Sequence, residues 1–344
     1  MTFENYNIGF NNSCFIVAEL SANHVQDFNI AIKTIEAMAQ SGADAVKLQT
    51  YKPSSLSLNV DNYYYGPKEK GLWQGYRPWD LYTKAATPYE WQEDLKVKAE
   101  ELGMLCFSSP FDFEGVDLME ELKMPIYKIA SLEINDIPLI EYVASKGKPI
   151  ILSTGAATLG DIELAVNTCK KCGNNEIAVL QCSSQYPTPV EKANLKRLPH
   201  LQQTFYAIPG LSDHTPGSVV PIASVSLGAK IIEKHFILDR SLDSPDANFS
   251  MEPSEFQEMV DAVRFAEKAM GQLDYTLPEE DRLRRRSLFA VQDIEAGEAF
   301  TKSNIRSVRP GHGLHPKHYY DLLDKKANVF IEKGTPLNWE MIVS

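Results

Sequence analysis

The stretch that decides the fold is residues 150–181, which read IILSTGAATLGDIELAVNTCKKCGNNEIAVLQ. Its two ends, Ile150–Ser153 and Ile177–Gln181, are short apolar runs of the kind that form buried strands. Between them, Leu159, Ile162 and Val166 follow the spacing of a helix that buries one face. A strand, a helix and a second strand in this order predict two parallel strands joined by a crossover helix.

The same alternation runs through most of the chain. Short apolar runs are separated by segments with helical spacing, and they are Cys14–Glu19, Ala45–Gln49, Leu105–Ser108, Tyr127–Ala130, Ile150–Ser153, Ile177–Gln181, Phe205–Gly210 and Lys230–His235. Eight such units within about 260 residues predict an α/β fold of the (β/α)8 or TIM-barrel type. A doubly wound open sheet is the alternative, but it would normally place a glycine-rich turn after the first strand, and none follows Glu19.

The texture of the sequence changes after the predicted last barrel helix, Pro253–Gly271. Residues 273–286 combine a proline with several acids and arginines, which is typical of a linker. The runs Ser287–Gln292 and Asn328–Ile331, separated by turn signals, then predict a small β-rich domain. The predicted division is a barrel domain over residues 1–275, a linker over 276–286 and a small domain over 287–344.

Composition excludes several classes of protein. The 344 residues are 44% hydrophobic and 23% charged, which is ordinary for a globular chain. There are 34 Lys and Arg against 46 Asp and Glu, and a net charge of −12 makes a poor binder of nucleic acid or of an anionic membrane. No apolar run approaches the ~20 residues of a membrane helix, and Met1–Asn12 lacks a signal-peptide pattern.

The cysteines indicate the compartment. Five cysteines are few and odd in number for this length, so we expect reduced thiols and a cytoplasmic protein. Cys169 and Cys172 form a single CxxC without a second pair. A metal or redox site usually needs more ligands than this, so we expect these two residues to mark a solvated helix end.

One predicted connection is unusually long and aromatic. Residues 51–87, between the second predicted strand and a helix that starts near Pro88, include Tyr63, Tyr64, Trp73 and Trp79. Long loops in compact domains are usually functional or disordered, and this one is too aromatic for a free linker. We expect a folded lid at the mouth of the barrel.

Polar residues occupy the ends of all eight predicted strands, where TIM-barrel active sites lie. Lys47 and Lys128 would repel each other at one mouth unless an anion lay between them. Hydroxyl groups that could donate to the same anion belong to Ser109, Ser131, Ser153 and Ser212. This set predicts a phosphate or carboxylate site. In the alternative, the lysines are structural and pair with Glu19 or Glu133.

Two histidines are candidate metal ligands. His214 and His235 lie one strand–helix unit apart, so in a barrel they end neighbouring strands. Imidazole binds transition metals, and two histidines with open positions would make a Lewis-acid site. Their spacing leaves metal binding and a structural role equally open, and His24 is a rival ligand. Glu19 and Glu133 could serve as general base, hold sugar hydroxyls or balance the lysines.

The strand-end motifs occur in a fixed order along the chain. They are AELSANH (18–24), KLQT (47–50), SSPF (108–111), YKIAS (127–131), LSTG (152–155), YPTP (186–189), GLSDH (210–214) and EKHF (233–236). The tail adds DI (293–294), GE (297–298), NIR (304–306) and RPG (309–311). Together they resemble the sialic acid synthase family with its C-terminal antifreeze-like (SAF) domain, over nearly the whole chain.

The resemblance implies an enzyme that condenses phosphoenolpyruvate with an amino sugar to a nine-carbon keto acid. The positions that match the phosphoenolpyruvate site are Lys47, Ser109, Lys128, Ser131, Ser153, Ser184 and Ser212. Ser184 departs from the pattern of the neuraminate synthases, which have an Asn at this position. The positions that match catalytic residues are Glu19, Glu133, His214 and His235, and the two histidines match ligands of a divalent metal, Mn²⁺, Mg²⁺ or Co²⁺.

The resemblance also implies a sugar site and a partner. The positions that match sugar-contacting residues are Gln49, Tyr186, Asp246 and Arg309. Arg309 matches an arginine that the SAF domain offers to the partner subunit's active site, so a homodimer is implied. The partners expected are therefore the two small-molecule substrates and a second copy of the chain, without nucleic acid or membrane.

Several loops are similar to the pseudaminate branch of this family. They are the AELSANH motif near the start of the chain, the aromatic segment Leu72–Tyr82, Asp239–Ser241 and Gly313–Pro316. That branch implies 2,4-diacetamido-2,4,6-trideoxy-L-altrose as acceptor, and a role in cell-surface glycan and flagellin glycosylation. The neuraminate and legionaminate branches are the close alternatives. Outside the family, a metal-dependent barrel aldolase or isomerase and a non-catalytic SAF binding protein stay open.

Overall fold

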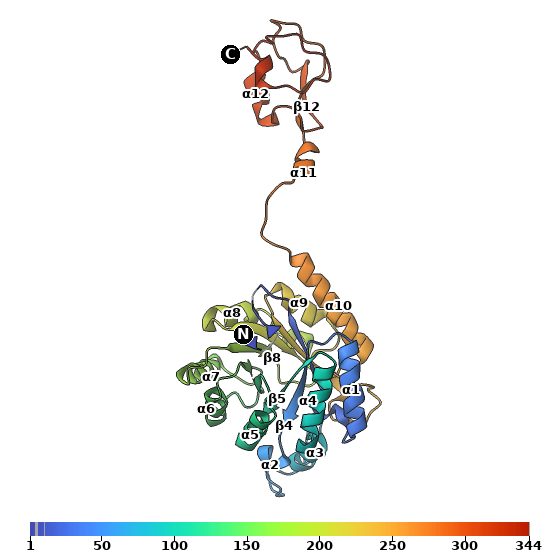
Figure 1. Cartoon of the computed structure of the whole chain (residues 1–344), viewed down its shortest axis with the longest axis vertical. Coiled ribbons are helices and arrows are strands. Elements are labelled where there is room, and N and C mark those ends of the chain that lie inside the picture. Colours follow the sequence, from blue (N-terminus) through green and yellow to red (C-terminus); the bar gives the residue numbers. More distant parts are fainter. Residues whose placement is uncertain (4–5, 10, 344) are drawn as a thin grey trace. The chain divides into compact units, whose positions relative to one another are not determined.

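The computed structural model describes residues 1–3, 6–9 and 11–343, which fold into two compact units, Met1–Gly271 and Gln272–Ser344. In the first unit, eight parallel strands of the described chain close into a barrel in the order β10-β3-β4-β5-β6-β7-β8-β9, with helices around them (Figure 1). The strands are β3 (Phe15–Glu19), β4 (Ala45–Thr50), β5 (Leu105–Pro110), β6 (Tyr127–Ile129), β7 (Ile150–Ser153), β8 (Ile177–Cys182), β9 (Ile208–Asp213) and β10 (Ile231–His235). The predicted TIM barrel is confirmed.

The helices that follow the strands bury one face on the barrel. In α7 (Leu159–Lys171), Thr158 and Asp161 cap the start reciprocally, and Ile162 and Val166 are buried. The other long helices are α1 (Phe28–Gln40), α4 (Gln92–Glu101), α5 (Phe113–Glu121), α6 (Ile137–Ser145), α8 (Arg197–Phe205), α9 (Val219–Ser226) and α10 (Pro253–Met270). Short 3₁₀ turns are η1 (Ser21–His24), η2 (Tyr89–Trp91), η3 (Val190–Lys192) and η4 (Ala247–Phe249), and a hairpin of β1 (Thr2–Phe3) and β2 (Tyr6–Asn7) begins the chain.

The seventh strand begins later than the sequence predicted. Phe205 is the last residue of α8, where it is buried together with Leu198 and Leu201 on one helix face. Tyr206 then ends the helix in a left-handed conformation with φ 54°, and β9 begins at Ile208. The apolar Phe205 therefore belongs to the helical period, and its prediction as a strand residue was wrong.

The CxxC prediction was also partly wrong. Cys169 is fully buried in the core of the barrel unit, because it lies on the same face of α7 as Ile162 and Val166. Cys172 is half-buried and ends the helix. Both thiols are free, so Cys169 serves packing and does not mark a solvated helix end.

The barrel interior changes from apolar to polar along the strands. Val17 and Ala45 face each other in the apolar cluster that fills the lower barrel. Side chains alternate between the two faces of a strand. Glu19 and Lys47 lie two residues after Val17 and Ala45, so they also point into the barrel. The sequence therefore places an ionic layer directly on top of an apolar floor, at the carboxyl ends of the strands.

The lid segment (residues 51–87) is a folded excursion between β4 and α4. It contains α2 (Pro53–Leu56) and α3 (Pro78–Ala85). Two contacts tie it to the loop that follows β10: the Trp73 indole N–H donates to the Pro245 carbonyl oxygen at 3.0 Å, and Lys84 pairs with Asp243 at 2.7 Å.

The second unit is a small β-containing domain with its own core. Strand β11 (Ser287–Ala290) pairs antiparallel with β12 (Ile305–Val308), and α12 (Tyr319–Leu322) follows, with short turns η5 (Pro316–His318) and η6 (Trp339–Met341). The predicted run Asn328–Ile331 is not a strand, since only Ile331 forms a bridge, with Ile294. The segment predicted as a linker contains α11 (Glu279–Leu283). No helix in the described residues is long and apolar enough to cross a membrane.

Candidate active site

A cavity of about 210 Å³ opens at the carboxyl ends of the barrel strands. Most of the predicted site residues line it, and these are Glu19, Lys47, Gln49, Lys128, Ser131, Glu133, Ser153, Tyr186, Ser212, His214, His235 and Asp246. Ser109 and Ser184 do not line it, although both hydroxyl oxygens are buried. Arg309 lies in the C-terminal unit.

The two predicted lysines meet at a carboxylate that the sequence did not single out. Glu233 Oε1 lies 2.8 Å from Lys47 Nζ and 3.4 Å from Lys128 Nζ, and it accepts a hydrogen bond from the Ser212 hydroxyl at 3.0 Å. Lys47 also pairs with Glu19 at 3.0 Å. The alternative, in which the lysines pair with carboxylates of the protein, is therefore confirmed for Glu19, whereas neither lysine forms an ion pair with Glu133 among the described residues and Glu233 is the carboxylate that both lysines share.

The ionic layer, formed by Glu19, Lys47, Lys128 and Glu233, is almost completely buried. Burial by itself would raise the pKa values of Glu19 and Glu233, but His235 and Lys47 at Glu19, and Lys128 and Lys47 at Glu233, outweigh it and lower both pKa values. Burial would likewise lower the pKa of Lys47, but Glu19 and Glu233 raise it above its ordinary value. At Lys128 burial prevails and lowers the pKa. The two carboxylates therefore stay ionised and neutralise the two lysines.

Several buried hydroxyls beside this layer lack a partner among the described residues. They are the Oγ atoms of Ser109, Ser153 and Ser184. The carboxylate oxygen Glu233 Oε2 is also buried and has no hydrogen-bond partner among the described residues. A Cβ built on Gly155 would lie 2.5 Å from Ser184 Oγ and 2.9 Å from Ser131 Oγ, so only glycine lets these hydroxyls gather there. Buried polar atoms without partners cost free energy, and of the three hydroxyls that of Ser153 lines the cavity, where it is a donor suited to a bound anion.

The two predicted metal ligands lie side by side. The ring centroids of His214 and His235 are 5.3 Å apart. His214 Nδ1 donates to the Ser183 carbonyl oxygen at 3.0 Å. The lone pair of the neutral ring therefore lies on Nε2, which can bind a metal. His235 Nε2 is 3.1 Å from Glu19 Oε2, and its Nδ1, which has no hydrogen-bond partner among the described residues, is 3.7 Å from Asp246 Oδ2.

This arrangement fits a divalent metal that takes only part of its shell from the protein. Among the described residues no group of three His, Cys, Asp or Glu could hold an ion on its own. Two imidazoles are one protein ligand fewer than catalytic metal sites usually have, so water and substrate would have to supply the rest of the shell. The rival ligand His24 lies outside the cavity, fully buried against Trp91, and burial lowers its pKa to about 4.

Glu133 and Cys182 complete the polar wall. Burial raises the pKa of Glu133 to about 7, and Lys128 only partly offsets this effect. Glu133 is therefore the carboxyl whose protonation state changes near neutral pH, as a general acid or base requires. Cys182 points inward from the end of β8, with Sγ 3.9 Å from His214 Nδ1. Sequence reasoning missed Cys182, although it lies two residues after Leu180, which points into the barrel, and so faces the same side of the strand.

The outer wall of the cavity is mostly apolar and comes largely from the lid segment. Its lid residues are Tyr51, Leu56, Lys68, Trp73, Leu81, Tyr82 and Ala85. The Trp73 ring lies 5.7 Å from that of Tyr186, which in turn packs 4.5 Å from the His214 ring. The predicted lid thus lines the site, but no sequence pattern indicated which of its side chains would face inward.

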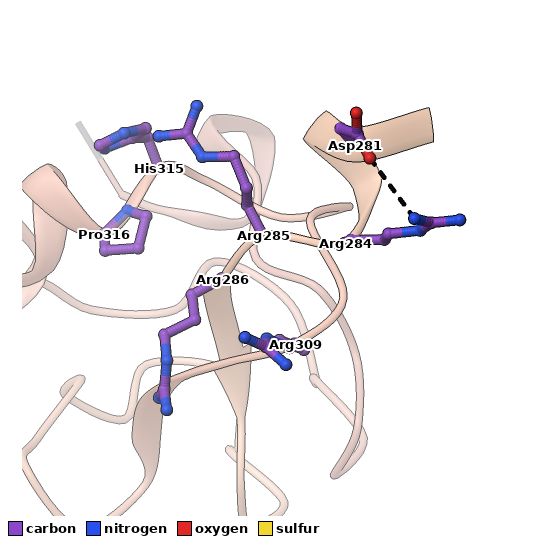
Figure 2. A pocket seen from close by; sticks show the side chains of 7 residues that line it. All are labelled: Asp281, Arg284, Arg285, Arg286, Arg309, His315 and Pro316. Atoms are coloured by element: carbon purple, nitrogen blue, oxygen red, sulfur yellow. Dashed lines mark hydrogen bonds and ion pairs between the residues drawn. The ribbon is translucent and has the colours of Figure 1, made fainter. Parts of the chain in front are cut away.

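Arg309 lies in a basic hollow of the C-terminal unit. Figure 2 shows the hollow, which is lined by Asp281, Arg284, Arg285, Arg286, Arg309, His315 and Pro316. Arg284 pairs with Glu280 and Asp281, whereas Arg285, Arg286 and Arg309 have no carboxylate partner in the described part of this unit. Acidic and basic residues balance in the C-terminal unit as a whole, so the chain's net negative charge lies on the barrel unit.

Known proteins match this chain over nearly its full length. The family model for the NeuB family matches residues 34–275, and the model for the SAF domain matches residues 285–343. A pseudaminic acid synthase from Helicobacter pylori is 45% identical over 94% of this chain and 96% of its own length. An N,N'-diacetyllegionaminic acid synthase from Campylobacter jejuni is 37% identical over 91% of this chain and 95% of its own.

A solved structure agrees with this assignment. The N-acetylneuraminic acid synthetase from Leptospira borgpetersenii superposes with a TM-score of 0.74 at 32% identity, covering 82% of this chain and 93% of that one. The resemblance predicted from the strand-end motifs is thereby confirmed. The chain belongs to the NeuB family of sialic acid synthases, a family of enzymes, and its C-terminal unit is a SAF domain.

Proposed function

We propose that this chain condenses phosphoenolpyruvate with 2,4-diacetamido-2,4,6-trideoxy-L-altrose and water to give pseudaminic acid and phosphate. The observation that carries the chemistry is the buried pair of Lys47 and Lys128 at a cavity that the unpartnered hydroxyl of Ser153 also lines. The similarity to the pseudaminic acid synthase of Helicobacter pylori supports the choice of acceptor.

The donor would bind over the ionic layer. Lys47 and Lys128 supply ammonium groups, and the hydroxyls supply neutral donors to phosphate and carboxylate oxygens. The hydroxyl donors are Ser109, Ser131, Ser153, Ser184 and Ser212. Ser184 would take part through its unpaired hydroxyl, in the place of an amide.

The acceptor would lie between the ionic layer and the lid segment. Gln49 donates to Glu19 at 2.9 Å, and Asp246 accepts from the Ser21 hydroxyl at 2.5 Å, so both polar groups are fixed at the cavity wall. Tyr186 offers a ring face, and burial raises the pKa of its phenol, which stays a hydrogen-bond donor. Arg309 of the partner subunit would complete the sugar site, which makes the functional unit a homodimer.

His214 and His235 would hold the divalent metal, which is Mn²⁺, Mg²⁺ or Co²⁺. A metal bound there would supply Lewis-acid polarisation of the acceptor's aldehyde oxygen. The protein's part is to fix the two imidazoles: Ser183 sets the tautomer of His214, and Glu19 holds Nε2 of His235, which leaves Nδ1 of His235 for the metal.

In the proposed reaction, C3 of phosphoenolpyruvate attacks the aldehyde carbon and forms the new carbon–carbon bond. Positive charge develops at C2, where the ionised Glu19 carboxylate would stabilise it. Water adds at C2 and loses its proton to Glu133, whose pKa of about 7 suits a base at neutral pH. The hemiketal phosphate then collapses by C–O cleavage to the α-keto acid and inorganic phosphate.

A three-acceptor assay tests this function. The chain is mixed with Mn²⁺, phosphoenolpyruvate and either the altrose, its legionaminate-pathway isomer or N-acetylmannosamine, and phosphate release is followed. We expect kcat/KM for the altrose to exceed the others by at least about tenfold, since one or two mismatched substituents typically cost 1–3 kcal/mol. A preference for another acceptor would assign the chain to that branch, and no phosphate release would leave an aldolase, an isomerase or a binding protein.

A further inference from the structure

The lid segment contributes a third lysine to the cavity, Lys68, which sequence reasoning did not single out. Its backbone is fixed, because its N–H donates to the Tyr76 carbonyl oxygen and its own carbonyl oxygen accepts from Gly75 N–H, both at 2.9 Å. These two bonds close the turn that carries Lys68 and Trp73 together. Lys68 is therefore held at the mouth and does not trail from a free loop.

The side chain of Lys68 is seated on an aromatic wall. Its Nζ lies 4.9 Å from the centroid of the Trp73 ring, a favourable position for a cation. Trp73 is itself fixed by its bond to Pro245 and by its ring contact with Tyr186. The ammonium of Lys68 is thus held at the lid wall of the cavity.

The charge of Lys68 is not neutralised as those of the deeper lysines are. Lys47 and Lys128 share Glu233, and Lys47 also pairs with Glu19. No carboxylate of the described residues forms an ion pair with Lys68, and its pKa is lowered by burial alone. Among the lysines that line the cavity, Lys68 is the one whose field is free to act on a ligand that approaches.

We propose that Lys68 captures the anionic donor substrate at the mouth of the cavity. This proposal rests on the proposed function, because the donor is taken to be phosphoenolpyruvate. The donor carries two or more negative charges and must approach a barrel unit whose net charge is negative. A fixed cation in a cleft raises the local concentration of anions and the rate at which they enter. Lys68 thereby offsets the repulsion that the acidic surface creates.

The test compares Lys68→Gln with Lys70→Gln. Lys70 is exposed on the same segment, so both variants remove one positive charge from the same part of the surface. For Lys68→Gln we expect kcat/KM for phosphoenolpyruvate to fall roughly five- to tenfold at low ionic strength, and its dependence on salt to flatten. We expect kcat and the KM for the acceptor to stay unchanged, and Lys70→Gln to match the unsubstituted protein.

Three outcomes would overturn the proposal. They are equal behaviour of the two variants, an unchanged salt dependence in Lys68→Gln, and an effect of Lys68→Gln on the KM for the acceptor alone. The unsubstituted protein separates this test from that of the function. If it releases no phosphate from phosphoenolpyruvate with any acceptor, the proposed function fails; if it does and Lys68→Gln is silent, only the role of Lys68 fails.

Discussion

Replacement of His235 by alanine is expected to abolish metal-dependent turnover, with kcat/KM at least about 10³-fold lower. The reason is geometric: His214 and His235 are the two imidazoles that face one another in the cavity, and one of them cannot hold a catalytic metal. Turnover and Mn²⁺ binding by calorimetry are measured on the same preparations. The control is His200→Ala, since His200 is exposed on α8 outside the cavity.

Two results would contradict this expectation. One is Mn²⁺ binding in His235→Ala that is as tight as in the unsubstituted protein. The other is full turnover after the protein is stripped with a chelator, which would remove the metal from the mechanism altogether.

Replacement of Glu233 by alanine is expected to lower the free energy of unfolding of the barrel unit by about 3–5 kcal/mol, the usual cost of removing one partner from a buried ion pair. Glu233 is 2% exposed and is the carboxylate that Lys47 and Lys128 share. Its loss leaves buried positive charge without its partner. Urea unfolding measures the change, and Glu163→Ala, an exposed glutamate on α7, should change stability by less than about 0.5 kcal/mol.

An anion provides a second readout for the same site. Phosphate should stabilise Glu233→Ala more than the unsubstituted protein, because it restores negative charge between the two lysines. A stability loss below about 1 kcal/mol, or equal phosphate effects on both proteins, would mean that Glu233 does not hold this layer together.

The fold follows from local sequence patterns to a large extent. Strand and helix alternate with their own periods in residues 150–181, and a closed parallel barrel is the arrangement that buries both faces of eight such strands. The errors lie at boundaries. Phe205 fits a strand and a helix face equally well by its apolarity, and only the packing of α8 decides between them.

Most of the site follows from strand ends, but its pairings do not. Lys47, Lys128 and the histidines were placed because barrel topology brings strand ends together. Glu233 bridges the lysines, and Glu133 does not. This choice depends on which side chains point into the closed barrel and how far they extend across it. Lys68 lies in a segment without periodicity, so no pattern could bring it to the cavity; its position depends on the tertiary contact of Trp73 with Pro245.

The most direct test of the central claim is the fate of oxygen during turnover. The chain, Mn²⁺, phosphoenolpyruvate and the altrose are incubated in ¹⁸O-labelled water, and the phosphate and the nine-carbon keto acid are analysed by mass spectrometry. The account predicts label in the keto acid and none in the phosphate, because the oxygen of water adds at C2, the C–O bond breaks and the bridging oxygen leaves with phosphorus. Labelled phosphate would show P–O cleavage and contradict the account.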